Sequence, residues 1–309
     1  MRALSDHTTT AGTSDQTARR KHLAGVKSWG YQLRLIDPEA IAASRFDLFV
    51  TDHAISANRR FVREFTPAEV ERMKTRPDGS RRIVLAYLSI GEAERYRFYW
   101  RQEWYEPGKA PAWLAAANDR WDGNWRVRFW QPGWQDLIYA ASTPGAATYL
   151  ARIKAQGFDG IYLDRADVYA ELLPERGSAE TEMVRFIQRL AETARRDAPQ
   201  FLVVMQNAEE LIARRDVREA IDAIAKEDLL YGVEHDETAN PRGMVAESLS
   251  LLRRARSNGL AVFAVEYLSD AVTAGKAAAR LDKEGIVPLV AERSLGTLDY
   301  RAEGASAPP

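Results

Sequence analysis

The chain has 309 residues, of which 46% are hydrophobic and 28% charged, a composition typical of a globular protein that buries a sizeable core. Its 43 basic and 44 acidic residues leave a net charge of -1, so no basic field indicates a nucleic-acid partner. The absence of cysteine excludes disulfides, thiolate nucleophiles and cysteine-ligated metals, and four histidines are too few to indicate a multi-histidine metal centre.

Both ends of the chain are polar. Residues 1–24 are rich in threonine and lack the apolar core of a signal peptide, so they predict a disordered leader. Residues 302–309 predict a disordered tail, and no linker or repeat divides residues 25–301, which predicts a single domain. No apolar run is long enough to span a bilayer, so we expect no membrane partner. As written, the chain predicts a cytoplasmic protein or an export signal upstream of this start.

From residue 28 onward, short apolar runs alternate with helical segments. Thr66, Pro67 and Glu69 form the signature of a capping box, which predicts a helix that ends near Thr75. Apolar residues recur at helical spacing from Met183 until Pro199 stops that helix, and glycines 259 and 285 predict two further helix ends. The strand candidates are 29–33, 46–52, 83–89, 126–130, 158–164, 201–206, 221–227, 261–266 and 286–290.

This repeated strand–helix unit predicts an α/β fold with a parallel sheet. No dinucleotide-binding or P-loop glycine motif follows any strand, so the sequence favours a closed (β/α)8 TIM-type barrel over an open nucleotide-binding sheet. Nine strand candidates are one too many for such a barrel. We therefore expect either 126–130 or 286–290 to be an extra strand outside the barrel wall.

Polar residues end several of the predicted strands, where this barrel fold carries its active site. Carboxylates gathered there without metal ligands raise one another's pKa values, as a general acid requires at neutral pH. A structural ion-pair network with arginines 95, 97 and 165 is the alternative. The strand-end residues are Asp52, Glu92, Asp164, Gln206, Asn207, Glu227 and Glu266.

Seven of the eight tryptophans lie between residues 100 and 134, in a stretch interrupted by proline and glycine. The stretch predicts a long loop at the carboxyl end of the third strand. Aromatic rings beside carboxylates suit the apolar face of a sugar, and Trp100 and Trp130 are our candidates for that role. A loop whose rings only pack against one another is the alternative.

Five segments together resemble glycoside hydrolase family 114: WGYQL at 29–33, YLSIGEAERYRFYW at 87–100, GFDGIYLDRADVY at 157–169, QNAEEL at 206–211 and KEDLLYG at 226–232. The resemblance implies endo-α-1,4-polygalactosaminidase activity and an exported protein. It also implies that Asp164 and Glu227 are the catalytic carboxylates. The pocket positions that it implies are Asp52, Tyr87, Glu92, Asn207 and Glu266.

We therefore expect a monomeric glycoside hydrolase that cleaves an α-linked amino-sugar polysaccharide, galactosamine-containing by the resemblance, without metal or cofactor. One carboxylate protonates the leaving oxygen, and the other attacks the anomeric carbon or activates water. The more apolar neighbours of Glu227 favour it as the acid, with Asp164 as nucleophile or base. The alternatives are a non-catalytic carbohydrate-binding barrel and a scaffold whose acids only form ion pairs.

Overall fold

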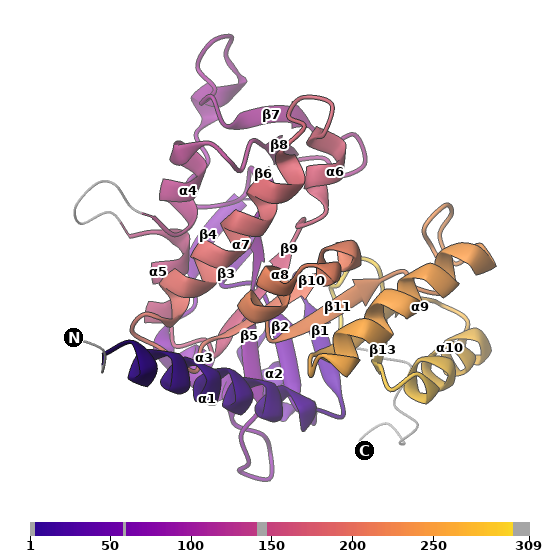
Figure 1. Cartoon of the computed structure of the whole chain (residues 1–309). Coiled ribbons are helices and arrows are strands. Elements are labelled where there is room, and N and C mark those ends of the chain that lie inside the picture. The colour runs from indigo at the N-terminus through magenta and orange to yellow at the C-terminus, as the bar shows by residue number, and fades with distance from the viewer. Residues whose placement is uncertain (1–3, 58–59, 141–146, 299–309) are drawn as a thin grey trace.

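The computed structural model describes residues 4–57, 60–140 and 147–298. Eight parallel strands pair in chain order, and the last lies beside the first, where the Trp29 indole donates to the Val287 carbonyl oxygen at 3.1 Å (Figure 1). The predicted TIM-type barrel is confirmed. Its strands are β1 (Trp29–Gln32), β2 (Leu48–Thr51), β5 (Ile83–Ser89), β9 (Gly160–Asp164), β10 (Leu202–Gln206), β11 (Ala223–Glu227), β12 (Ala261–Tyr267) and β13 (Val287–Ala291).

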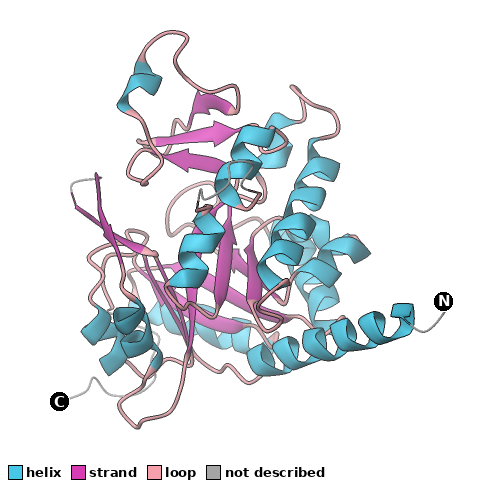
Figure 2. Cartoon of the chain, turned by 90° about the vertical axis from the view of Figure 1, so that its left-hand side faces the viewer, coloured by secondary structure: helices cyan, strands magenta, loops and turns pink. Residues whose placement is uncertain are grey.

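Of the two candidates for the extra strand, 126–130 lies outside the barrel. β8 (Asn124–Val127) pairs antiparallel with β6 (Glu92–Glu94) and β7 (Leu114–Ala117), and this small sheet stands beyond one end of the barrel (Figure 2). Arginines alternate with apolar residues over 126–129, the pattern of a strand with one solvated face. The continuous apolar run at 286–290 instead suits a wall strand, and it forms β13.

The stretch predicted as a loop is therefore partly ordered into elements. We refer to residues 90–140 as the insertion; besides β6, β7 and β8 it contains η1 (Gln102–Tyr105) and α4 (Pro132–Ile138). A hairpin of β3 (Ala54–Ala57) and β4 (Arg60–Glu64) follows β2.

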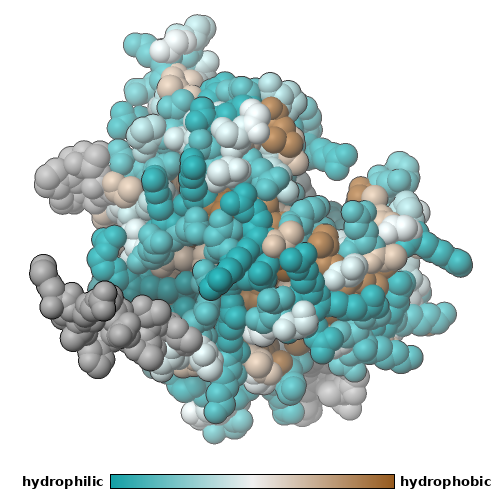
Figure 3. Space-filling model, viewed as in Figure 1, coloured by the Kyte–Doolittle hydropathy of each residue, from teal (hydrophilic) through white to brown (hydrophobic). Residues whose placement is uncertain are grey.

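Helices cover the outside of the barrel, and the face that carries α7, α8 and α9 is largely hydrophilic (Figure 3). The capping box is present: the Thr66 hydroxyl accepts from the Glu69 amide, and the Glu69 carboxylate accepts from the Thr66 amide. The remaining helices are α2 (Pro38–Ala43), α3 (Pro67–Lys74), α5 (Tyr149–Ala155), α6 (Val168–Leu172), α7 (Ala179–Arg195), η2 (Glu209–Ala213), α8 (Arg215–Ala220), α9 (Arg242–Ser257) and α10 (Ala271–Lys283).

The prediction of a disordered leader was wrong for the described part of that segment. Helix α1 (Leu4–Ala24) lies along one side of the molecule (Figure 1). Arg19 donates to Asp222 at 2.9 Å and to the Pro199 carbonyl oxygen at 2.6 Å, and Leu23 is buried. Long-range polar contacts therefore hold a helix with little amphipathic pattern of its own. The predicted tail at 302–309 lies outside the described residues.

Aromatic side chains fill the interior of the barrel. Tyr31 and Tyr162 pack with ring centroids 5.2 Å apart, and Trp29 and Phe263 pack at 5.6 Å; all four are buried. Such a packed layer is usual inside TIM barrels. It forms the floor beneath the polar residues at the strand ends, because alternate residues of a strand face the same side. No helix in the described ranges is long and apolar enough to cross a membrane.

Candidate active site

Asp164 and Glu227 meet at the carboxyl ends of β9 and β11, with β10 between them. Gln206, the last residue of β10, donates from its Nε2 to Asp164 Oδ1 at 2.8 Å and to Glu227 Oε2 at 2.6 Å. We call Asp164 and Glu227 the carboxylate pair. The structure thus brings together the two acids that the sequence predicted as catalytic, through a residue that the sequence analysis named only as a strand end.

Each acid of the carboxylate pair also accepts a hydrogen bond from a tyrosine on a neighbouring strand. The Tyr87 hydroxyl donates to Asp164 Oδ2 at 2.6 Å, and the Tyr267 hydroxyl donates to Glu227 Oε1. An arginine guanidinium lies over each tyrosine ring, Arg97 at 5.6 Å from the Tyr87 centroid and Arg293 at 4.5 Å from that of Tyr267. These contacts orient both carboxylates before any substrate binds.

Local backbone geometry places two further hydrogen-bond donors at the carboxylate pair, one from Asn207 and one from Arg165. Asn207 adopts a left-handed conformation (φ 57°), donates to Glu227 Oε2 at 3.2 Å and accepts from the Glu227 amide at 3.1 Å. The amide of Arg165 donates to Asp164 Oδ1 at 2.8 Å. Gly91 passes so close to this turn that a Cβ would lie 2.2 Å from the Arg165 carbonyl oxygen, so only glycine fits there.

The charge on the carboxylate pair is poorly compensated. Burial, followed by the charge of Glu227, raises the pKa of Asp164 to about 8. Burial also raises the pKa of Glu227, although the hydrogen bond from Tyr267 opposes that shift. Among the described residues, neither acid forms an ion pair with a lysine or arginine side chain. Both remain partly exposed, so the pair combines raised pKa values with access from solvent.

Asp52 belongs to a different arrangement. Both its oxygens accept from Arg97 Nη1, at 2.7 and 2.6 Å, and Arg97 Nε donates to Glu94 at 2.5 Å. We call Asp52, Glu94 and Arg97 the Arg97 cluster. Burial by itself would raise the pKa of Asp52, but the charge of Arg97 and a contact with His53 lower it to about 2. Asp52 therefore stays ionised within a buried ion pair.

The other two predicted pocket acids are occupied by protein partners. Glu92 is 1% exposed and accepts from Asn118 at 2.7 Å, Asn124 at 3.0 Å and Arg165 at 2.9 Å. Glu266 is fully buried and accepts from the amides of Leu230 and Tyr231 at 2.8 and 3.2 Å, and burial raises its pKa to about 8. Glu92 links the insertion to Arg165 of the barrel, and Glu266 holds the loop after β11 against β12.

The tryptophans mainly pack against one another. Trp100 contacts Trp104 and Trp125 with ring centroids 5.0 and 4.4 Å apart, while Trp130 lies against Phe129 and beneath the Arg176 guanidinium at 5.2 Å. Both candidates are half-buried, and neither contacts the carboxylate pair through any hydrogen bond or ring contact of the described residues. Trp134 is completely buried in the core and Trp121 is 55% exposed.

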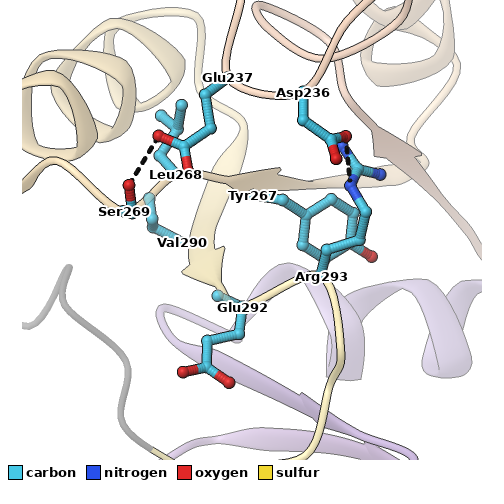
Figure 4. Close-up of a pocket in the computed structure, with 9 residues that line it drawn as sticks. Asp236, Glu237, Tyr267, Leu268, Ser269, Val290, Glu292 and Arg293 are labelled. Atoms are coloured by element: carbon cyan, nitrogen blue, oxygen red, sulfur yellow. Dashed lines mark hydrogen bonds and ion pairs between the residues drawn. The ribbon is translucent and has the colours of Figure 1, made fainter.

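A cavity of about 210 Å³ lies at the ends of β12 and β13, and neither acid of the carboxylate pair lines it. Tyr267, whose hydroxyl reaches Glu227, forms part of its wall beside Arg293 (Figure 4). Three carboxylates and one arginine, Arg293, line this cavity. Arg293 forms ion pairs with Asp236 at 2.8 Å and with Asp228 at 2.9 Å. The acids are Asp236, Glu237 and Glu292.

The chain matches the model of glycoside-hydrolase family GH114 over residues 8–306. It belongs to this family. An uncharacterized protein of Deinococcus radiodurans is 34% identical, and the alignment covers 91% of this chain and 85% of that protein. An uncharacterized protein of Thermotoga maritima is 31% identical, and the alignment covers 79% of this chain and 71% of that protein. The family resemblance of the sequence motifs is thereby confirmed, and so is the assignment as a glycoside hydrolase.

Solved structures support the same fold. The glycoside hydrolase domain of PelA from Pseudomonas aeruginosa superposes with a TM-score of 0.68 at 22% identity, covering 89% of this chain and 98% of that domain. Alpha-L-fucosidase isoenzyme 2 from Paenibacillus thiaminolyticus superposes with a TM-score of 0.53 at 13% identity, covering 89% of this chain and 47% of that one. At these identities the likeness establishes the barrel.

Within the described ranges, no group of three or more histidine, aspartate or glutamate side chains is arranged to hold a metal ion. Two residues that contact the carboxylate pair, Gln206 and Tyr267, have no role predicted from the sequence. Tyr267 directly follows Glu266, and the period of two in a strand could have identified it, since Glu266 and Tyr267 face opposite sides of β12. Nothing in the sequence signals that the Gln206 amide reaches both acids.

Proposed function

We propose that this GH114 protein is an endo-acting hydrolase of an α-linked amino-sugar polysaccharide and that Asp164 and Glu227 are its catalytic pair. The observation that carries the proposal is that both acids accept from one nitrogen of Gln206, while neither forms an ion pair with a lysine or arginine among the described residues. Paired carboxylates with raised pKa values supply the acid and the nucleophile or base of glycoside hydrolysis.

The spacing of the pair supports a retaining mechanism. Asp164 Oδ1 and Glu227 Oε2 can be no farther apart than two hydrogen bonds placed end to end. Retaining glycosidases hold their carboxyl groups about 5 to 5.5 Å apart, whereas inverting ones need about 6.5 to 9.5 Å to admit a water. The short bridge leaves no room for that water between these oxygens.

In the proposed reaction, Glu227 gives its proton to the leaving glycosidic oxygen while Asp164 bonds to the anomeric carbon. Water, deprotonated by Glu227, then releases the sugar from Asp164. The rigid backbone donor from Arg165 favours charge on Asp164, which supports its role as nucleophile. Azide tests the roles: with Asp164→Gly it should give a glycosyl azide of inverted configuration, and with Glu227→Ala one of retained configuration. The opposite pattern would exchange the two roles.

The acidic cavity beside Tyr267 supports an amino-sugar substrate. Its three carboxylates exceed the charge of Arg293, which already has two acidic partners, so the cavity suits a ligand with positive charge. The amine of a de-N-acetylated hexosamine is an ammonium group at neutral pH. The family motifs favour galactosamine within such a polymer.

The test is incubation with de-N-acetylated α-1,4-polygalactosamine, followed by detection of new reducing ends and sizing of the products. Oligosaccharides of several lengths should accumulate early, as expected of endo cleavage, and the Asp164→Asn variant should release none. The fully N-acetylated polymer serves as the uncharged comparison. Binding of these polymers without cleavage would instead favour the carbohydrate-binding alternative.

We further propose that a monomer carries out this reaction without metal or cofactor. The pair has its hydrogen-bond donors within the same chain, from Tyr87, Gln206, Asn207 and Tyr267. Activity should persist after dialysis against a chelator. A loss that zinc or calcium restores would contradict this part of the proposal.

A further inference from the structure

The amide of Gln206 stands between the two acids. The side chain is 2% exposed, and its two N–H groups account for the two contacts, one to Asp164 at 2.8 Å and one to Glu227 at 2.6 Å. Its Oε1 atom is buried and accepts a hydrogen bond from none of the described residues. The reverse orientation would place this oxygen against two carboxylates, so the hydrogen bonds determine which way the amide points.

We infer that Gln206 is a positioning residue that keeps the carboxylate pair at working separation and donates one N–H to each acid throughout the reaction. This inference rests on the proposed function of the pair. It assigns to Gln206 a role separate from substrate contact, because the amide is buried beneath the acids.

The chemistry of the amide explains why this residue type suits the position. During the reaction, negative charge leaves Asp164 as it bonds to the sugar and appears on Glu227 as it loses its proton. A neutral donor with one N–H for each acid keeps both contacts without turning, whichever acid carries the charge. Lysine or arginine would stabilise the ionised forms and so oppose the raised pKa values, which would weaken the acid.

The Arg97 cluster supplies the comparison within the same molecule. There a single guanidinium joins Asp52 and Glu94, at 2.6 Å and 2.5 Å. Asp52 has a pKa of about 2, while burial still raises the pKa of Glu94 although Arg97 opposes that shift. At the carboxylate pair a single amide makes the corresponding two contacts without adding charge, and the pKa of Asp164 is about 8. The cation opposes protonation of the acids it joins, whereas the neutral amide leaves the raised pKa values of both Asp164 and Glu227 in place. The pair can therefore keep the one proton that Glu227 needs as the acid.

Gln206→Met tests the inference, because methionine matches the length of glutamine and lacks the amide. Gln156→Met is the matched control: Gln156 is also buried, also donates twice from Nε2, to the carbonyl oxygens of His53 at 2.7 Å and Phe65 at 2.9 Å, and also has an unpartnered Oε1. Both variants lose two buried hydrogen bonds, but only Gln206→Met removes donors from the pair.

With the polymer substrate, kcat of Gln206→Met should fall about 100-fold, since loose positioning of reacting groups costs about that factor. The acid limb of its pH–rate profile should move to higher pH, because the ionised acids lose a donor. Gln156→Met should lower thermal stability and leave the shape of the profile unchanged. A wild-type profile and rate for Gln206→Met would overturn the inference.

A second measurement separates this inference from the proposed function. The free energy of urea unfolding, followed from pH 4 to 9, reports the titration of the pair without any substrate. Gln206→Met should change the pH dependence of that free energy over this range, and Gln156→Met should shift the whole curve in parallel. If no polymer is cleaved but this difference appears, the proposed function fails while the coupling of Gln206 to both acids stands. If both variants shift in parallel, the coupling itself is refuted.

Discussion

Two groups of acids, one buried and one partly exposed, lie at the same end of this barrel and differ in the residues that bind their carboxylates. In the Arg97 cluster, one guanidinium pairs with Asp52 and Glu94, and the pKa of Asp52 is about 2. In the carboxylate pair, an amide and two tyrosine hydroxyls hold Asp164 and Glu227, and the pKa of Asp164 is about 8. The two groups adjoin, since Arg97 lies over the ring of Tyr87.

The difference shows that burial alone does not decide what an acid can do. Both groups lose hydration, which raises the pKa of every member. The charge of Arg97 reverses the effect for Asp52, which stays ionised, but only opposes it at Glu94, whose pKa remains raised by burial. Neutral donors leave the effect in place at both Asp164 and Glu227, so the pair can hold and release a proton near neutral pH. The first group stabilises structure, and the second is suited to proton transfer.

The strongest test of this contrast removes each acid of the carboxylate pair. Asp164→Asn and Glu227→Gln should each reduce kcat about a thousandfold or more, because each removes the nucleophile or the acid. Their thermal stability should equal or exceed that of the wild type, since a repulsive pair is relieved. Polymer cleavage assays and thermal unfolding measure the two effects. The surface variant Glu219→Gln is the control, and near wild-type turnover in either site variant would refute the assignment.

Breaking the other group should affect folding. Arg97→Met leaves Asp52 and Glu94 buried without a cation and should cost about 3 to 5 kcal/mol of unfolding free energy. The triple variant Arg97→Met, Asp52→Asn, Glu94→Gln removes those charges and should recover part of the loss. Urea unfolding at pH 7 measures both variants. A loss below about 1 kcal/mol for Arg97→Met would show that the cluster does not depend on its cation.

Asp164 and Asp52, one from each group, should also respond to pH with opposite sign. The Asp164 pKa is raised to about 8, so wild-type stability falls as pH rises from about 4, the unfolded value, through 8. Asp164→Asn should therefore gain relative stability over that window. The Asp52 pKa is lowered to about 2, so its contribution is present above about pH 4 and is lost as pH falls through 2.

Asp52→Asn should consequently lower the unfolding free energy most at neutral pH and change it very little near pH 2. Unfolding free energies of both variants from pH 2 to 9, each subtracted from wild type, give two curves of opposite slope. Parallel curves would mean that the two acids have similar environments.

The smallest expected effect concerns the tryptophans. If Trp130 or Trp100 meets the polymer, replacement by alanine should weaken binding about 2- to 10-fold, the value of one aromatic contact. Oligosaccharide titration should also quench intrinsic fluorescence less in that variant. Trp121→Ala, at the most exposed of the described tryptophans in the insertion, is the control. Unchanged affinity and quenching in both variants would leave these rings a purely structural role.

Much of the barrel could be predicted from local pattern. Continuous apolar runs such as 161–163 and 201–205 indicated wall strands because only burial on both faces suits them. The capping residues at Thr66 and Glu69 placed the start of α3. Helix α1 could not be predicted in this way, because its order depends on Arg19 reaching Asp222, a contact 203 residues along the chain.

In the site, too, some features follow from the local sequence and others depend on tertiary contacts. The sequence by itself determined that Asp52, Asp164 and Glu227 end parallel strands, because strand period and barrel topology bring such ends to one rim. Only the tertiary structure decided that Arg97 folds back from the insertion onto Asp52, while the neutral amide of Gln206 joins the other two. The pKa of a carboxyl group depends on the charges and donors within a few ångströms in space, and residue spacing along the chain does not specify those neighbours.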